Sequence, residues 1–171
     1  MPSGRLIQAG CTAVTLAMLL GCKETTESTS PDEAAEVLIH PGVGVGALKF
    51  GMNVDQMREI LGEPDSTQSG RAYEYLSKGM AVVTASGDVG VIVLMFGDSG
   101  LPDSRLIIAC KYRTAKGIGM GSTWAEIVEA YGEPSSQRTL GGVEELTYPA
   151  LNAKFSLRSS KVVHMQFRMP R

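Results

Sequence analysis

The sequence has few of the side chains that enzymes use for chemistry. Among 171 residues there are two histidines, three cysteines and one tryptophan, and aromatic residues make up 6%. Neither His40 nor His164 has a Cys, Asp or Glu at the spacing of a zinc site. There is no Gly-x-Ser-x-Gly elbow and no nucleotide-binding glycine pattern. We therefore expect no enzymatic activity, no metal and no cofactor.

The sequence also lacks a strong overall charge. A formal net charge of -2 argues against a nucleic-acid binder, which needs a large basic surface. The charge is unevenly placed, because no acidic residue follows Leu146. That segment holds five basic residues, which form either a solvated strand face or a surface for a partner: Lys154, Arg158, Lys161, Arg168 and Arg171.

Residues 1–21 are predicted to be an export signal. Arg5 supplies the positive charge, and the apolar run Leu6–Leu20 is shorter than the about 20 residues that span a bilayer. The run ends in Leu19-Leu20-Gly21-Cys22, which resembles the lipobox of bacterial lipoproteins. The resemblance implies cleavage after Gly21 and diacylglycerol on the Cys22 thiol. An ordinary secretory signal or a short anchor is the alternative.

A lipid on Cys22 would anchor the mature chain to a membrane. With Cys11 in the removed signal, only Cys110 would keep a free thiol, so a disulfide framework within one mature chain is excluded. Residues 22–36 are polar and acidic and are predicted to form a flexible tether. Lys23, rather than Asp, follows the lipidated cysteine, which favours the outer membrane, facing the periplasm.

A fourteen-residue segment occurs twice, seventy positions apart. Residues 51–64 and 121–134 both begin with Gly and end in Gly-Glu-Pro. Asn53 and Thr123 stand three residues before Gln56 and Glu126, the spacing of a capping box. Each copy therefore predicts a short helix that cannot persist alone and must pack its apolar stripe on another element.

The stretch after each predicted helix contains strand-like runs joined by hairpin turns. We therefore predict an α+β fold, a tandem repeat of two units, each a short helix packed on an antiparallel sheet. The first repeat is expected to occupy residues 37–100 and the second residues 101–171.

The two copies differ in their strand patterns. Residues 153–158 and 163–168 alternate between apolar and polar, as in a sheet with one face in water. Residues 91–96 are apolar throughout, so this strand is either covered on both faces or exposes an apolar patch of the kind that binds partners. The candidate partner-binding residues are Val91, Val93 and Met95 in the first copy, and Lys154, Arg158 and Arg168 in the second.

The unit Gly-Met, Met57, Leu61-Gly62-Glu63-Pro64, followed by a Tyr, a Gly and a hairpin, resembles the SmpA/OmlA type of envelope lipoprotein domain. The tandem arrangement is similar to the β-lactamase inhibitory protein. These resemblances span roughly residues 43–168 and imply protein binding, to components of the outer-membrane assembly machinery or to a secreted β-lactamase. This chain has two copies, unlike the first family, and lacks a disulfide within each unit, unlike the second.

The expected function is a membrane-anchored envelope lipoprotein that binds a protein partner without catalysis, in outer-membrane assembly or envelope maintenance. Two alternatives remain at this stage. One is an inhibitor of a secreted enzyme. The other is a small-ligand carrier or enzyme that uses a groove between the repeats, lined by Arg113, Glu144 and Tyr148.

Overall fold

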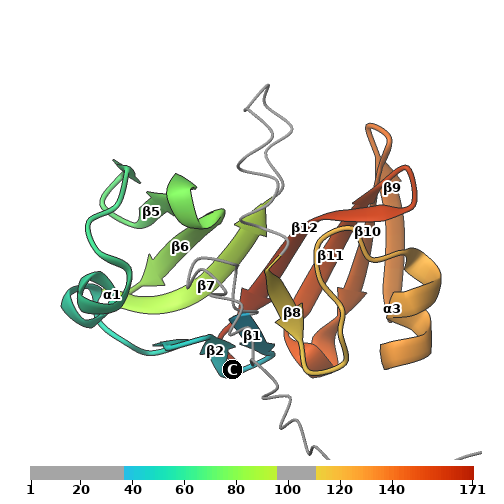
Figure 1. Ribbon diagram of the computed structural model, residues 1–171, viewed down its shortest axis with the longest axis horizontal. Coiled ribbons are helices and arrows are strands. Elements are labelled where there is room, and N and C mark those ends of the chain that lie inside the picture. The colour runs from blue at the N-terminus through green and yellow to red at the C-terminus, as the bar shows by residue number, and fades with distance from the viewer. Residues whose placement is uncertain (1–36, 96–110) are drawn as a thin grey trace, which may run out of the picture. The chain divides into compact units, whose positions relative to one another are not determined.

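The computed structural model describes residues 37–95 and 111–171, which belong to one compact unit, Asp32–Arg171. The predicted signal, Cys22, the tether and Cys110 lie outside the described residues. In the described part, the chain forms two β-sheets, two α-helices and two short 3-10 helices (Figure 1).

The larger sheet has eight strands, all antiparallel, in the order β4-β5-β6-β7-β12-β11-β10-β9. Four come from the first half of the chain and four from the second. The 3-10 helices η1 (Leu76–Lys78) and η2 (Pro149–Leu151) join β5 to β6 and β10 to β11. The strands are β4 (Ser66–Gln68), β5 (Ala72–Tyr75), β6 (Met80–Ala85), β7 (Asp88–Met95), β9 (Ser136–Leu140), β10 (Val143–Tyr148), β11 (Ala153–Arg158) and β12 (Lys161–Arg168).

The smaller sheet has four short strands in the order β3-β2-β1-β8. Figure 1 shows β1, β2 and β8 between the two α-helices. Strand β1 runs parallel to β8, and the other pairs are antiparallel. The Tyr112 hydroxyl donates to the Lys78 carbonyl at 2.8 Å, and burial raises the pKa of Tyr112 to about 12. The strands are β1 (Val37–His40), β2 (Gly44–Val45), β3 (Leu48–Lys49) and β8 (Tyr112–Thr114).

Both helices begin with the predicted capping boxes. At α1 (Val54–Leu61), the Asn53 side chain accepts from the Gln56 N–H at 2.9 Å, and the Gln56 side chain accepts from the Asn53 N–H at 3.1 Å. Thr123 and Glu126 form the same pair at α3 (Trp124–Tyr131). These bonds satisfy N–H groups that a helix start leaves without partners, which explains why eight residues suffice.

The core lies between one face of the large sheet and a layer formed by the helices and the small sheet. Met57 of α1 and Ile127 of α3 are both 0% exposed, and they share one cluster with the inward side chains of β6, β7, β11 and β12. Strand positions seventy-three residues apart supply the same kind of core residue. The pairs are Met80 and Ala153, Val82 and Phe155, Ile92 and Met165, and Leu94 and Phe167.

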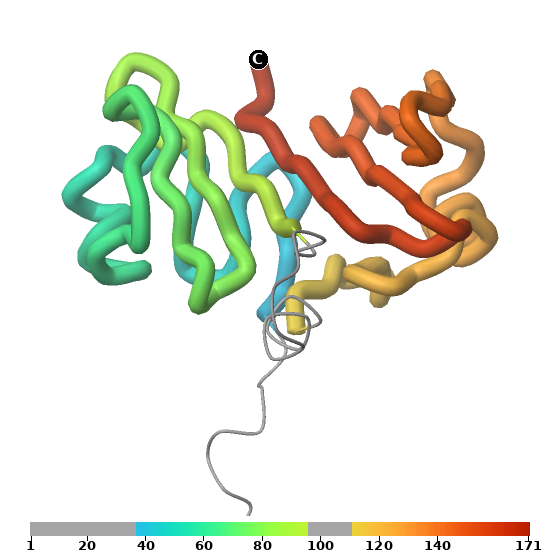
Figure 2. The backbone as a smooth tube through the Cα atoms, turned by 90° about the horizontal axis from the view of Figure 1, so that it is seen from above, coloured from blue at the N-terminus to red at the C-terminus, as the bar shows by residue number. Residues whose placement is uncertain are grey.

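The two halves of the large sheet are related by an approximate twofold axis. Strands β7 and β12 pair in the middle of the sheet (Figure 2), in the register Val91 with Arg168 through Met95 with His164. Val93 pairs with Gln166, which is its own equivalent in the second half. The axis therefore passes through this pair. The hydrogen-bond register and the irregularity in β6–β7 recur at matching positions in β11–β12.

The predicted fold class was wrong. The prediction of an α+β tandem repeat, with a separate helix-on-sheet unit in each copy, gave too much weight to the two short capped helices. The chain is mostly strand, and both copies contribute to one continuous sheet because β7 and β12 pair edge to edge. A second sheet, formed by segments preceding each helix, covers the core with them.

Candidate partner-binding surface

The face of the eight-stranded sheet opposite the core, here called the open face, carries most of the predicted partner-binding residues. Its four central strands contribute two sets of five side chains in equivalent positions. The apolar half consists of Ala81, Val83, Val91, Val93 and Met95, and the polar half of Lys154, Ser156, His164, Gln166 and Arg168. Every apolar side chain of the first half is thus replaced by a polar one in the second.

The central strand pair brings the two halves together. Val91 lies beside Arg168, Val93 beside Gln166, and Met95 beside His164. The three β7 side chains are half-buried, whereas Ile92 and Leu94 between them are 0% exposed. Neither alternative from the sequence therefore describes β7 fully, because its open-face side chains are neither fully covered nor fully exposed.

Two of the three basic candidate residues join this surface. Lys154 is the cross-strand neighbour of Gln166, and Arg168 is two residues further along the same strand. With the Gln166 amide oriented so that its oxygen faces Arg168, which satisfies both groups, this oxygen accepts from Arg168 Nε and Nη2, both at 3.1 Å. Arg158 is exposed at the other end of β11, where it pairs with Lys161 beside the hairpin turn. The structure therefore groups Lys154 and Arg168 but places Arg158 apart from them.

A charged cluster that the sequence did not predict borders the polar half. The Glu145 carboxylate oxygen Oε2 lies 2.5 Å from Arg138 Nη2 and 3.3 Å from Lys154 Nζ. Burial acts to raise the pKa of Glu145, but hydrogen bonds and charges from Arg138 and Lys154 outweigh it, so this pKa lies below its ordinary value. Two cations thus share one ionised carboxylate.

Ser156 and His164 form another unpredicted contact on the open face. Ser156 Oγ lies 3.4 Å from His164 Nδ1, which is long for a hydrogen bond. Burial lowers the pKa of His164, although the nearby Glu145 carboxylate partly opposes this effect. At neutral pH the ring is therefore neutral, and the positive charge of this half comes from Lys154 and Arg168.

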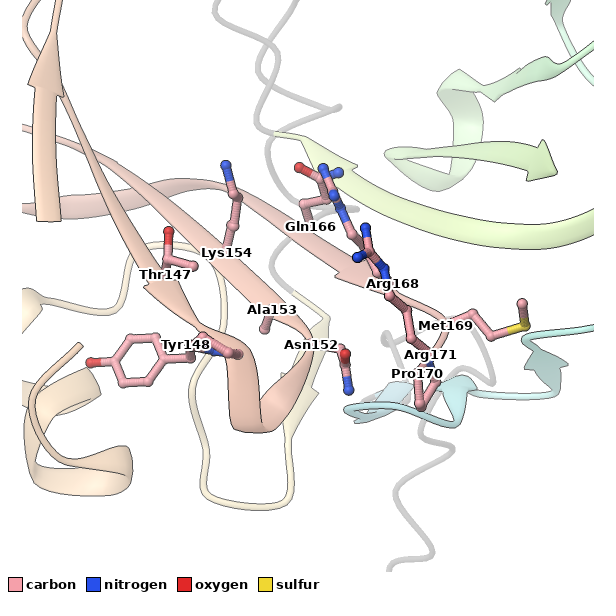
Figure 3. Close-up of a pocket in the computed structure, with 11 residues that line it drawn as sticks. Thr147, Tyr148, Asn152, Ala153, Lys154, Gln166, Arg168, Met169, Pro170 and Arg171 are labelled. Atoms are coloured by element: carbon pink, nitrogen blue, oxygen red, sulfur yellow. The ribbon is translucent and has the colours of Figure 1, made fainter. Parts of the chain in front are cut away.

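A cavity of about 400 Å³ lies where β10 leads into η2 and β12 leaves the sheet (Figure 3). Lys154, Gln166 and Arg168 line it, together with residues of the β10–β11 connection and of the segment after β12. A second cavity, of about 480 Å³, lies beside α3. The first is lined by Thr147, Tyr148, Pro149, Asn152, Ala153, Lys154, Gln166, Arg168, Met169, Pro170 and Arg171.

The groove predicted from Arg113, Glu144 and Tyr148 is not formed as a common site. Tyr148 lines the first cavity and Arg113 the second, while Glu144 is on β10 and contacts Gln137. Within residues 37–95 and 111–171, no three His, Cys, Asp or Glu side chains gather as metal ligands would. In the same residues, no helix is long and apolar enough to cross a membrane.

Comparisons with known proteins give one structural likeness. No family model matches the chain, and no curated protein matches its sequence. A DUF4309 family protein (YjgB) from Bacillus subtilis subsp. subtilis str. 168 is similar, with 11% sequence identity and a TM-score of 0.44. The match covers 68% of this chain and 77% of that protein. A likeness this distant carries no argument about function.

Proposed function

We propose that this chain is a membrane-anchored envelope lipoprotein whose open face binds a protein partner without catalysis. The observation that carries the proposal is the contrast between the two halves of the sheet. On the four central strands, the equivalent core positions are apolar in both halves except at Thr84, the equivalent of Leu157, whereas the five equivalent open-face positions change from apolar to polar. Packing of the sheet alone does not require such a change.

The combination of side chains on this face suits a protein interface. Protein interfaces join an apolar centre to a polar rim, and arginine is enriched in them. Here the β7 side chains provide the apolar part, Arg168 and Gln166 lie directly beside it on β12, and Lys154 is one strand further away on β11. A partner that buries the apolar half would therefore meet hydrogen-bond donors and positive charge at its border.

The proposed anchor is the lipid on Cys22, and the proposed location is the outer membrane, facing the periplasm. Two or three acyl chains hold a protein stably at a bilayer, whereas one chain gives only marginal binding. In cells fed an alkyne-labelled fatty acid, we expect label on the wild-type chain and none on Cys22→Ala. Label on Cys22→Ala, or release of the wild-type chain from membranes by salt, would disprove the anchor.

The binding function is tested by capture of a partner in cells. A photoreactive amino acid at Val93, at the centre of the open face, should crosslink one defined protein. The open-face change Val83→Asp should abolish this product, because it places a charge in the apolar half. The matched control is Ala115→Asp, at an exposed residue outside the open face, which should leave capture unchanged.

The charged half is tested by reversing its basic residues. Lys154→Glu with Arg168→Glu should reduce capture strongly, whereas Lys161→Glu, at an exposed position, should not. Thermal unfolding of each variant shows whether the fold persists. No crosslinked product at Val93, or equal capture by all folded variants, would rule out this face. The identity of the captured protein distinguishes envelope assembly from inhibition of a secreted enzyme.

A further inference from the structure

We infer that the cavity beside Lys154 and Arg168 binds a carboxylate group of the protein partner. The inference rests on the protein-binding function proposed above and specifies the chemistry of the partner. It predicts that an Asp or Glu side chain, or a carboxyl-terminal carboxylate, inserts between these two basic residues.

The composition of the cavity favours an anion. Of the eleven described lining residues, three are basic and none is acidic. Lys154, Gln166 and Arg168 come from two paired strands, and Figure 3 shows their side chains on the same side of the sheet. The remaining walls include Pro149, Met169 and Pro170, which suit the methylene groups of an acidic side chain.

The positive charges of the cavity are only partly neutralised within the described residues. Glu145 is the acidic contact of Lys154, at 3.3 Å, but Arg138 binds the same carboxylate oxygen more closely, at 2.5 Å. The cluster of one carboxylate and two cations therefore keeps a net charge of about +1 near neutral pH. Lys154 retains attraction for a second carboxylate.

Arg168 is held in place without losing its charge. The Gln166 amide oxygen that accepts from its Nε and Nη2 is neutral. A guanidinium group with its orientation fixed in this way loses less entropy when it binds a carboxylate. The amide thus orients Arg168 and leaves its charge for an incoming anion.

The first half of the sheet shows that these charges are not needed for the fold. At the equivalent positions, Lys154 is replaced by Ala81, Gln166 by Val93 and Arg168 by Met95. The equivalent of Thr147 is Glu74, which would repel an anion. An identical strand register thus forms without any basic residue, so the cationic cavity is a specific property of the second half.

The position of the cavity favours a carboxylate on a protein over a lipid headgroup. Arg168 is directly beside Val91 on the neighbouring strand, so a bound carboxylate would lie next to the apolar half. A partner with neighbouring apolar and acidic side chains fits both the apolar half and the basic cavity. A phosphate headgroup would use the basic residues but leave the apolar half uncovered.

The test uses the purified full chain in detergent and two small probes. N-acetylglutamic acid α-amide and N-acetylglutamine amide differ only in the side-chain carboxylate. Titration followed by ligand NMR should show at least about fivefold tighter binding of the acid, as expected for a charge-assisted bidentate contact. Lys154→Gln with Arg168→Gln should remove this preference, and Lys161→Gln should retain it.

Equal binding of the two probes, or a preference that survives Lys154→Gln with Arg168→Gln, would overturn the inference. A third probe, glycerol 1-phosphate, represents a lipid headgroup, and tighter binding of this probe than of the acid would also overturn it. Capture from Val93 in cells is independent of these titrations. Capture without an acid preference would leave the binding function standing and overturn the inference. An acid preference without capture would reject the binding function and, with it, the assignment of the carboxylate to a protein partner.

Discussion

The two halves of the large sheet have the same backbone and opposite open faces. Each half has a capped eight-residue helix, four strands in the same order and one irregularity at the same position. On the four central strands, the helix-side positions are apolar in both halves except at Thr84, yet five open-face positions are apolar in the first half and polar in the second. Packing against the helices thus constrains the residues of the helix-side face, whereas the residues of the open face can differ between the halves and serve binding.

The cores of the two halves also differ in kind, which gives the largest expected effect. The second half contains a cluster of four aromatic side chains, in which the Phe155 ring lies 5.7 to 6.3 Å from those of Tyr148, Phe167 and Tyr131. The equivalent of Phe155 is Val82, and both are 0% exposed. Phe155→Ala should lower the free energy of unfolding by about 4 kcal/mol, and Val82→Ala by about 2 kcal/mol.

Chemical denaturation with fluorescence detection measures both values. Because one sheet contains both residues, we expect a single unfolding transition for wild type and for each variant. Two separate transitions would show that the halves unfold independently, and equal losses for the two variants would show that the aromatic cluster adds nothing.

The second prediction compares two buried tyrosines. The Tyr148 hydroxyl donates to the Gly132 carbonyl at 2.9 Å, whereas the hydroxyl of its equivalent, Tyr75, has no hydrogen-bond partner among the described residues. Tyr148→Phe should therefore destabilise the protein by about 1 kcal/mol, and Tyr75→Phe should be neutral or stabilise it by up to about 1 kcal/mol. Destabilisation of similar size in both would reveal a partner for Tyr75. Paired thermal and urea unfolding curves decide between these outcomes.

The third prediction concerns the hairpin turns. Ser86 and Gly87 have φ of 56° and 93°, and their equivalents Ser159 and Ser160 have φ of 50° and 61°. A left-handed conformation costs a residue with a Cβ roughly 1 kcal/mol. Ser160→Gly should therefore stabilise the second hairpin by about 0.5 to 1 kcal/mol.

The matched control for the turn is Gly87→Ser, where an added Cβ meets no atom within 4 Å. Gly87→Ser should therefore destabilise the first hairpin through its backbone conformation alone, by an amount similar to the stabilisation expected for Ser160→Gly. Opposite shifts in the urea midpoint are expected, and shifts of the same sign would contradict the explanation.

The smallest expected effect is a pH dependence that arises at His164 in the second half. Burial lowers the pKa of His164 below 6.5, although Glu145 partly opposes this effect. Between the lowered pKa and 6.5, the unfolded chain binds more protons than the folded chain, so stability is lost as the pH falls. Unfolding midpoints between pH 7.5 and pH 5.5 should show this loss, less than about 1 kcal/mol.

His164→Asn should remove this slope, because an Asn side chain does not titrate. The fold should persist, since the equivalent residue, Val91, shows that it does not need an imidazole there. Glu145, Arg138 and Lys154 remain in the variant, so a slope that persists would be assigned to them.

Local features of the fold followed from the sequence, and its assembly did not. Capping-box spacing defines α1 and α3 because the bonds involve residues three apart. The edge strands β4 and β9 were not predicted, because an exposed edge is polar and lacks a strand-like apolar pattern; all five side chains of β9 are exposed. Pairing of β7 with β12 joins segments distant in sequence, and neither strand's pattern specifies its neighbour.

The candidate surface was likewise predicted only in part, because a local pattern shows which residues face solvent but not which distant segments lie beside them. Alternation of apolar and polar residues predicted which side of β11 and β12 faces solvent, and hence Lys154 and Arg168. The Arg138–Glu145 contact depends on the hairpin turn at Gly141-Gly142, which places these residues opposite each other. That Gly-Gly pair was a usable signal. The cavity itself depends on the segment after β12, whose path no local pattern describes.

The pairing of Val93 with its own equivalent has one more consequence. A seam in which one central position meets its own equivalent, and the other pairs are repeated on either side of it, is isologous, the geometry found where two identical subunits associate around a dyad. A shorter polypeptide with a single half could meet a second molecule of itself along this strand without any change of register. Joining two such halves in one chain lets the two sides of the dyad become unlike, which no symmetric homodimer can do.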